Sequence, residues 1–233
     1  MRYPAIVTFA AAMLLQNPLP PAGTAAARAQ ASIDLTGYWV SFVTEDWRYR
    51  MLTPPKGDYA AVPMTPDARK IADAWDPAAD EAAGNQCKSY GAAAIMRVPT
   101  RLHVTWQDDN TLRIDTDSGT QTRLFHFGPP PAARGNPTWQ GYSSAQWERP
   151  SSLKVMTADM RAGYLRKNGV PYSENAVLTE YFDMSPLPGG GQLLLVTAVV
   201  EDARYLQQAF IVSSQFKKET DGSKWDPTPC LSK

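Results

Sequence analysis

Apolar and polar side chains alternate along most of the chain from Tyr38 onward, which is the period of a β-strand with one buried face. The first such stretch, Tyr38–Thr44, places Tyr38, Val40 and Phe42 on one face. Further strands are predicted at Trp47–Met51, 93–98, 101–107, 111–117, 121–127, 143–148, 153–159, 176–184, 192–201 and 209–217.

One stretch follows the helical period instead. Thr65 is a favourable N-cap, Pro66 fits the first helical position, and apolar residues recur at helical spacing as far as Trp75. A second short, Ala-rich helix is expected over Ala78–Ala83. We therefore predict a helical insertion over about residues 65–84, between the second and third strands.

The order of these elements predicts a mostly β fold. Turn-forming residues separate the strands, as at Asp117–Gly119 and Gly189–Gly191. Two longer loops, 128–139 and 160–173, are rich in Pro, Gly, Arg or Asn and are candidates for functional segments. About ten strands, with helices confined to one stretch, favour an antiparallel sheet that closes into a barrel, because closure removes exposed sheet edges.

The N-terminal residues have the composition of a secretory signal peptide. A positive charge precedes Ala5–Leu15, an apolar run that is too short to span a bilayer. Small-residue cleavage sites follow, and we expect cleavage after Ala29 or Ala31. Residues 1–31 are then the signal, and residues 32–233 form a single barrel domain. The alternative is an uncleaved membrane anchor.

Composition and charge narrow the choice of partner and compartment. The 233-residue chain has 23 basic and 23 acidic residues and no run rich in Lys or Arg, so it has no electrostatic footprint for nucleic acid. No stretch after the signal is long and apolar enough to span a membrane. The two cysteines, Cys87 and Cys230, are expected to form a disulfide, which predicts a periplasmic or secreted protein. A reactive thiol or metal ligand is the alternative for this pair.

The segment Asp34–Trp39, with the sequence DLTGYW, resembles the Gly-x-Trp opening of lipocalin-like barrels. The resemblance implies a calycin-type barrel in which Trp39 closes one end and a disulfide through Cys230 straps the tail to the wall. In that family a late-strand Arg packs on the Trp, and the last strand here offers only Lys217 or Lys218. The role implied for Trp39 is structural.

A second resemblance covers roughly the C-terminal half of the chain. The motifs that carry it look like those of a large group of secreted bacterial proteins. They are Trp139–Ser143, Trp147–Glu148, Ser173–Glu174, Thr179–Tyr181 and Glu201–Asp202. The resemblance implies export and a β-rich fold, and it carries no catalytic assignment.

The hairpin over 101–117 contains the first candidate for acid/base chemistry. With Asp108–Asn110 as its turn, the pairing places apolar residues on one face and sets His103 opposite Asp115 on the other. A carboxylate at this cross-strand distance can hold the imidazole in one tautomer for proton transfer. The alternative is a solvated outer face of ordinary charge pairs, and the sequence leaves open which face is interior.

Glu180 is the second candidate, because it shares a strand face with apolar residues only. Burial among apolar groups raises the pKa of a carboxyl group toward values suited to a general base. The alternative is a structural ion pair inside the barrel with an arginine such as Arg48, Arg50 or Arg123.

Several other residues are candidates for substrate binding. Arg48 and Arg50 alternate with aromatic residues that include Trp47, which suits a pocket wall for an anionic or phenolic ligand. A solvated strand face explains this alternation equally well. Arg123 is a further candidate, and Tyr172 follows the second long loop, where it can line the mouth of a pocket.

The chain has none of the common nucleotide-binding, zinc-protease or serine-hydrolase motifs, and its two histidines are too few for a His-rich metal site. We therefore predict no metal and no cofactor. The first hypothesis is an exported barrel that holds a small apolar or aromatic molecule and acts on it as a lyase or isomerase. His103 oriented by Asp115, or else Glu180, is the proposed base, and Arg48 or Arg50 steadies negative charge. The alternatives are a carrier or sensor without chemistry and an envelope interaction module that uses the two long loops.

Overall fold

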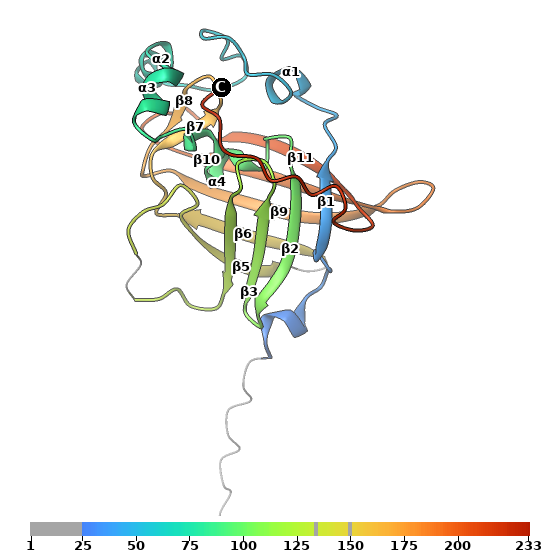
Figure 1. Ribbon diagram of the computed structural model, residues 1–233. Coiled ribbons are helices and arrows are strands. Elements are labelled where there is room, and N and C mark those ends of the chain that lie inside the picture. Colours follow the sequence, from blue (N-terminus) through green and yellow to red (C-terminus); the bar gives the residue numbers. More distant parts are fainter. Residues whose placement is uncertain (1–24, 133–134, 149–150) are drawn as a thin grey trace, which may run out of the picture.

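Every second residue of the long strands is buried, and these residues line one concave face. In β9 (Val177–Pro186) the buried positions are Leu178, Glu180 and Phe182, and burial alternates along β10 (Gln192–Glu201). In the computed structural model, which describes residues 25–132, 135–148 and 151–233, the sheet curls around this face into a closed barrel of nine strands (Figure 1). The predicted mostly β barrel is confirmed.

The order of the strands departs from a simple meander. The remaining strands of the barrel are β1 (Gly37–Ser41), β2 (Arg101–Asp108), β3 (Thr111–Thr116), β4 (Thr122–Phe127), β5 (Tyr142–Glu148), β6 (Ser152–Ala158) and β11 (Phe210–Lys218). Around the barrel they run β1-β11-β10-β9-β6-β5-β4-β3-β2, and β1 closes the ring by pairing with β2. The barrel is mixed, because β4 and β5 are parallel. Parallel neighbours need a crossover connection, which the long loop after Gly128 provides.

Residues 47–51 are not a strand, and this corrects the prediction. They contain α1 (Trp47–Arg50), a single helical turn. Both edges of β1 are already occupied, since β1 pairs with β11 on one side and β2 on the other. The chain that leaves β1 therefore has no free edge to join. Asp46 turns it with a left-handed φ of 51°, a conformation that Asp adopts more readily than most residues.

Residues 93–98 are not a strand either. They belong to the buried helix α4 (Ala92–Ile95) and the turn that follows it. The N–H groups of Ala94 and Ile95 both donate to the Gly91 carbonyl at 2.9 Å. A short apolar run does not distinguish a buried strand from a buried helix, and the high helix propensity of Ala decides the outcome here.

The helical insertion caps one end of the barrel and lies between β1 and β2. Its first helix, α2 (Pro66–Asp73), begins as predicted, with Thr65 Oγ1 accepting a hydrogen bond from the Ala68 N–H at 3.2 Å. The other helical pieces are α3 (Pro77–Ala82) and the 3-10 turn η2 (Lys88–Tyr90). The segment predicted as a loop over 160–173 instead contains a small antiparallel sheet of β7 (Gly163–Arg166) and β8 (Val170–Tyr172).

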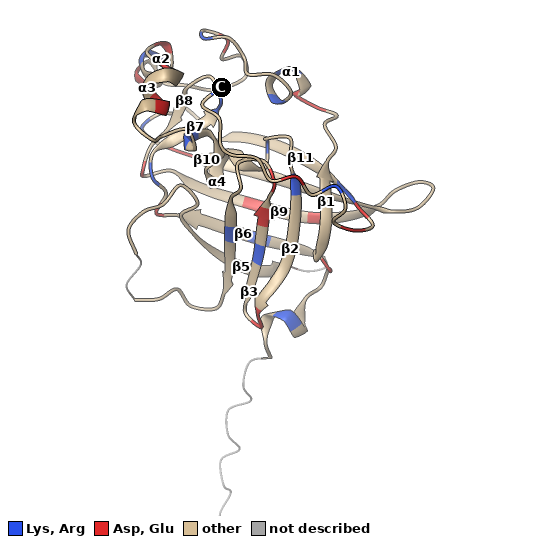
Figure 2. Ribbon diagram, in the orientation of Figure 1, with Lys and Arg blue, Asp and Glu red and all other residues tan. Residues whose placement is uncertain are grey.

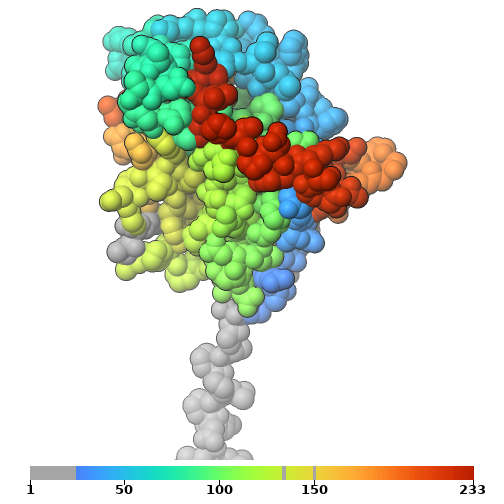
Figure 3. Space-filling view, viewed as in Figure 1, coloured from blue at the N-terminus to red at the C-terminus, as the bar shows by residue number. Residues whose placement is uncertain are grey.

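The cap has a core of its own that continues into the barrel. Ala68 of α2 and Leu165 of β7 pack in one cluster with Leu178, Val200 and Phe210 of the barrel wall. Figure 3 shows that the cap segments and the C-terminal tail cover this end of the molecule. The cap is therefore fixed to the barrel by apolar contacts.

Aliphatic and aromatic side chains fill the barrel interior, and Trp39 is fully buried among them. The indole Nε1 of Trp39 donates to the Leu35 carbonyl at 2.9 Å. The Nζ of Lys218 lies 4.3 Å from the centre of the indole ring and donates to the Thr36 carbonyl. Gly37 has a φ of 103°, and a Cβ at this position would lie 3.1 Å from Lys218 Nζ. Lys218 thus occupies the place in which the family resemblance implies an Arg.

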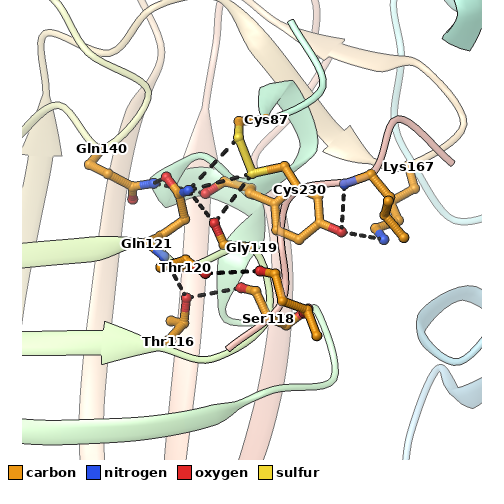
Figure 4. Close-up of a disulfide and its surroundings, with 12 residues drawn as sticks. Cys87, Thr116, Ser118, Gly119, Thr120, Gln121, Gln140, Lys167 and Cys230 are labelled. Atoms are coloured by element: carbon orange, nitrogen blue, oxygen red, sulfur yellow. Dashed lines mark hydrogen bonds between the residues drawn. A yellow bond between two sulfur atoms is a disulfide. The ribbon is translucent and has the colours of Figure 1, made fainter. Parts of the chain in front are cut away.

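A disulfide joins Cys87 to Cys230, as predicted. It ties the C-terminal tail to the segment before α4 (Figure 4). Beside it, the Tyr90 hydroxyl accepts hydrogen bonds from Lys167 Nζ at 2.7 Å and from the Leu231 N–H at 3.3 Å. The tail is thus strapped across the capped end of the barrel.

The N-terminal turn η1 (Ala27–Gln30) docks at the opposite end (Figure 1). The Ala27 N–H donates to Asn110 Oδ1 at 2.9 Å, and Trp147 Nε1 donates to the Ala27 carbonyl at 2.8 Å. Most of the expected signal peptide lies outside the described residues, and its two expected cleavage points, after Ala29 and Ala31, fall at this turn. None of the described helices has the length and apolar character needed to cross a membrane.

Replacement of both Cys87 and Cys230 by serine is expected to destabilise the fold. The bridge joins residues 143 positions apart, and the chain-entropy relation gives about 4–5 kcal/mol as an upper value for a loop of this length. Denaturant unfolding of the double variant and of the unreduced parent measures the difference. A loss below about 1 kcal/mol would show that the cap and tail are held without the bridge.

Candidate anion-binding site

His103 and Asp115 pair across β2 and β3 as predicted, and they lie on the outer face of the wall. The neighbours of His103 on β2, Leu102 and Val104, are the residues that are buried in the core. His103 stacks on Tyr38 with ring centroids 4.2 Å apart. This position corresponds to the outer-face alternative in the sequence analysis.

Asp115 is engaged by a neighbour on its own strand. Arg113 Nε and Nη2 donate to its two carboxylate oxygens at 2.7 and 2.8 Å. Partial burial raises the pKa of Asp115, but hydrogen bonds from Arg113 and Thr122 outweigh burial and hold that pKa below its ordinary value. The carboxylate is thus committed to Arg113 more than to His103.

Glu180 lies inside the barrel in an ion pair with Arg123. Arg123 Nη1 donates to Glu180 Oε1 at 2.9 Å, and Nη2 donates to Oε2 at 2.6 Å. The same Nη2 donates to Thr157 Oγ1 at 3.3 Å, and the guanidinium carbon lies 4.9 Å from the centre of the Phe125 ring. Both charged groups are buried, and they connect β4 to β9 across the interior. His103 and Glu180 therefore face opposite sides of the wall and share no cavity.

The remaining predicted residues are dispersed. Arg48 is 64% exposed and pairs with Asp58 at 2.6 Å, and Trp47 is exposed beside it. Tyr172 is fully buried under the cap, where burial raises the pKa of its phenol. Arg50 differs from these residues, because its side chain is buried and lines a cavity.

This cavity, with a volume of about 50 Å³, is lined by three arginines from separate parts of the cap. Arg50 comes from α1, Arg97 from the turn after α4, and Arg166 from the end of β7. Their exposed fractions are 7%, 6% and 4%. In Figure 2, α1 and β7 both carry basic segments at this end of the molecule. Apolar side chains that include Leu52 and Val98 complete the walls.

The three guanidinium groups differ in how far they are compensated. Arg97 Nη1 and Nη2 both donate to Asp46 Oδ2 at 3.2 Å. Arg50 Nε donates to the Arg97 carbonyl at 2.9 Å, and Arg166 Nη1 donates to the Ala60 carbonyl at 2.8 Å. Within the described part of the chain, no carboxylate lies within ion-pair distance of Arg50 or Arg166. These two arginines are therefore buried charges with no carboxylate at ion-pair distance among the described residues.

Four nitrogen atoms of these two arginines are buried without a hydrogen-bond partner among the described residues. They are Nη1 and Nη2 of Arg50, and Nε and Nη2 of Arg166. Buried polar groups are nearly always paired, and leaving a donor unpaired costs about 1–3 kcal/mol, more where the group is charged. Both residues that carry these unpaired donors line the cavity, which makes it the candidate site for an acceptor.

The pKa values of the three arginines reflect their burial and their charged neighbours. Burial lowers the pKa values of Arg50, Arg97 and Arg166, and the charge of Arg97 lowers those of Arg50 and Arg166 further, while nearby carboxylates, among them Asp46, act in the opposite direction without cancelling the shift. An arginine nevertheless keeps its proton in proteins. The guanidinium carbon of Arg166 also lies 4.4 Å from the centre of the Tyr49 ring, in a cation–π contact. The cavity is therefore lined by three permanently charged guanidinium groups.

Of the three arginines, Arg50 is predicted as a binding residue from the sequence, whereas Arg97 and Arg166 are not. Arg97 is the single charged residue in the apolar run 92–98, and a lone charge in such a run indicates a buried arginine that needs a partner. Arg166 and Asp46 had no comparable signal, because their approach to Arg97 depends on how the cap folds.

Comparisons with known proteins add no assignment, since no protein-family model, curated protein or solved structure matches this chain. Within the described residues, no group of three or more His, Cys, Asp or Glu side chains is arranged to hold a metal ion. The assignment of a function therefore depends on the geometry of the arginine cavity.

Breaking the Arg123–Glu180 pair on one side is expected to be costly. Glu180→Leu leaves a buried guanidinium without its counter-ion, for which we expect a loss of about 3–5 kcal/mol of unfolding free energy. The double variant Arg123→Met/Glu180→Leu is expected to lose much less, because both charges are removed together. Denaturant unfolding of the two single variants and the double variant gives the coupling energy between the two residues. If the losses of unfolding free energy in the single variants simply add up in the double variant, the ion pair does not stabilise the interior.

Proposed function

We propose that this protein is an exported β-barrel that binds a small anionic molecule at its capped end, as a carrier or sensor. One observation carries the proposal: Arg50 and Arg166 are buried at one cavity, lack a carboxylate partner and retain four unpaired nitrogen donors among the described residues. Arginine forks match the oxygen geometry of carboxylates and phosphates. A bound anion satisfies these donors and compensates both charges.

The size of the cavity limits which part of a ligand it can receive. A cavity of about 150 Å³ is large enough to bind benzene, whereas this cavity measures about 50 Å³. It therefore suits an anionic head group. The rest of an organic ligand would lie at the mouth, where Leu52 lines the cavity and is itself exposed.

Export to the periplasm or the exterior is part of the proposal. The buried disulfide between Cys87 and Cys230 supports it, because such bonds persist in oxidising compartments. The apolar run at the N-terminus supports a signal peptide. A lipocalin-like relationship is supported by the corner in which Gly37 precedes the buried Trp39 and Lys218 covers its indole ring.

Binding is preferred over lyase or isomerase chemistry because the predicted bases lie elsewhere. Neither His103 nor Glu180 is among the residues that line the arginine cavity. Both carboxylate oxygens of Glu180 accept hydrogen bonds from Arg123. Cofactor-free proton transfer on an apolar or aromatic molecule stays a prediction, as does an envelope interaction through the two long segments.

Sulfate, added at constant ionic strength, is expected to raise the melting temperature of the parent protein. Ligands that bind only the folded state stabilise it by mass action. Arg50→Met and Arg166→Met are expected to lose most of this response, since each removes one of the two uncompensated charges.

Arg48→Met is the matched control for this experiment. Arg48 lies in the same helical turn as Arg50, and it is exposed. Sulfate also stabilises proteins by exclusion from their surfaces, so the difference between the two variants is the measure of specific binding. Equal responses of Arg48→Met and Arg50→Met would refute the proposed site.

Without added anion, Arg50→Met and Arg166→Met are expected to unfold at or above the melting temperature of the parent. Replacement of an uncompensated buried charge by an apolar chain of similar length removes a desolvation penalty. Differential scanning calorimetry in a buffer of chloride salts tests this expectation. A loss greater than about 2 kcal/mol would indicate that these arginines serve the fold instead of a ligand.

A further inference from the structure

The charges around the cavity indicate how much negative charge its occupant carries. Asp46 compensates Arg97, and Asp58 is paired with the exposed Arg48. Arg50 and Arg166 remain, and no described carboxylate lies within ion-pair distance of either one. A monoanion in the cavity leaves one of these buried charges uncompensated, whereas a dianion matches both.

Lys167 adds to the positive side of this balance. It also lines the cavity, and its Nζ lies 4.7 Å from the centre of the Tyr90 ring and donates to the Tyr90 hydroxyl. Tyr90 is in turn held by the Leu231 N–H of the tail. Glu45 adds to the negative side, because its carboxylate acts on Arg50 and Arg97. With Asp46 and Glu45 set against the three arginines and Lys167, the described groups around the cavity still carry more positive charge than a single carboxylate can balance.

The unpaired donors also favour an acceptor with more than two oxygens. Nε and Nη2 of Arg166 lie on one edge of its guanidinium group and can hold two oxygens in parallel. Nη1 and Nη2 of Arg50 provide two further donors from another element. A carboxylate has two oxygens, whereas a phosphoryl group presents three acceptor oxygens to such a set.

The volume distinguishes between the two kinds of dianion. A dicarboxylate distributes its charge over two groups joined by carbon atoms, and the cavity of about 50 Å³ is only a third of the size that admits benzene. A phosphoryl group carries both charges on one tetrahedral centre. Inorganic sulfate shares this compact form, but a sulfate monoester is a monoanion, so the phosphoryl group is the one that stays a dianion as the head group of an organic ligand.

We infer that the cavity receives a dianionic phosphoryl group, either as free phosphate or as the head of a phosphate monoester. Arg166 and Arg50 hold its oxygens, and Arg97 remains with Asp46. The inference depends on the proposed anion binding and specifies the chemical class of the ligand. Leu52, Val98 and Pro99 give the walls an apolar surface for the remainder of a monoester.

Phenyl phosphate and phenyl sulfate form a suitable pair of probes, because they have similar shapes and different charges. At about pH 7.5 phenyl phosphate is mostly a dianion, since the second pKa of a phosphate monoester is about 6, and phenyl sulfate is a monoanion. Isothermal titration calorimetry of the protein purified after export, at constant ionic strength, is expected to give at least about tenfold tighter binding of phenyl phosphate. At about pH 5, where phenyl phosphate is mostly a monoanion, this preference should disappear.

Histidine is the residue that ordinarily changes its charge between these two pH values, and a histidine near the cavity would affect binding at the lower pH. The charged or titratable groups that act on the three arginines or line the cavity are Glu45, Asp46, Asp58, Tyr49 and Lys167. His103 and His126 are not among the residues that line the cavity.

Variants and a third probe complete the test. Arg166→Met and Arg50→Met should bind both esters weakly and without preference, and Arg48→Met should keep the preference of the parent. Inorganic phosphate distinguishes the sources: tighter binding of phenyl phosphate indicates a monoester, and equal binding indicates free phosphate. Equal binding of the two esters by the parent, or a preference that survives at the lower pH, overturns the dianion inference alone. Binding of neither ester also overturns the dianion inference, and if the sulfate responses of Arg48→Met and Arg50→Met are equal as well, the proposed function is overturned with it.

Discussion

The pairing of β1 on both of its edges is the constraint on which the rest of the structure depends. Trp39 is opposite Lys218 of β11 on one side and Leu102 of β2 on the other, so this short strand closes the ring. The sheet then has no edge for the chain that leaves β1. That chain turns at Asp46 and passes over the rim as α1. The cap, and with it the arginine cavity, follows from closure of the barrel.

Buried arginines of this protein occur both with and without a carboxylate partner, and the two cases affect its stability differently. Inside the barrel, Arg123 forms two hydrogen bonds to a fully buried carboxylate, and the pair is electrically complete. In the cap, Arg50 and Arg166 are also buried, but they have only backbone carbonyls as hydrogen-bond partners among the described residues. A compensated pair contributes to specifying one packing arrangement. Uncompensated charges oppose folding until a ligand arrives, which is typical of binding sites.

A cap that concentrates positive charge must be held by other interactions. Apolar contacts supply one part, through the cluster that includes Ala68, Leu165 and Phe210. The disulfide supplies another, because it fixes the tail over the same end of the barrel. The chain from Leu231 through Tyr90 to Lys167 then connects the strapped tail to the cavity wall. The stability of this end is thus provided away from the arginines, and the arginines are left available to a ligand.

Local sequence patterns predict most of the barrel strands, the helical insertion with its Thr65 cap, and the pairing of Cys87 with Cys230, because each depends on local period, local capping or the presence of only two cysteines. They also fix the register that sets His103 opposite Asp115, since strand pairing follows from the turn. The folded arrangement is needed to establish which face of that hairpin is interior, that residues 47–51 and 93–98 contain helical turns, and that Arg50, Arg97 and Arg166 line one cavity. These outcomes depend on which strand edges are already occupied and on which groups are deprived of water, and both are properties of the closed barrel as a whole.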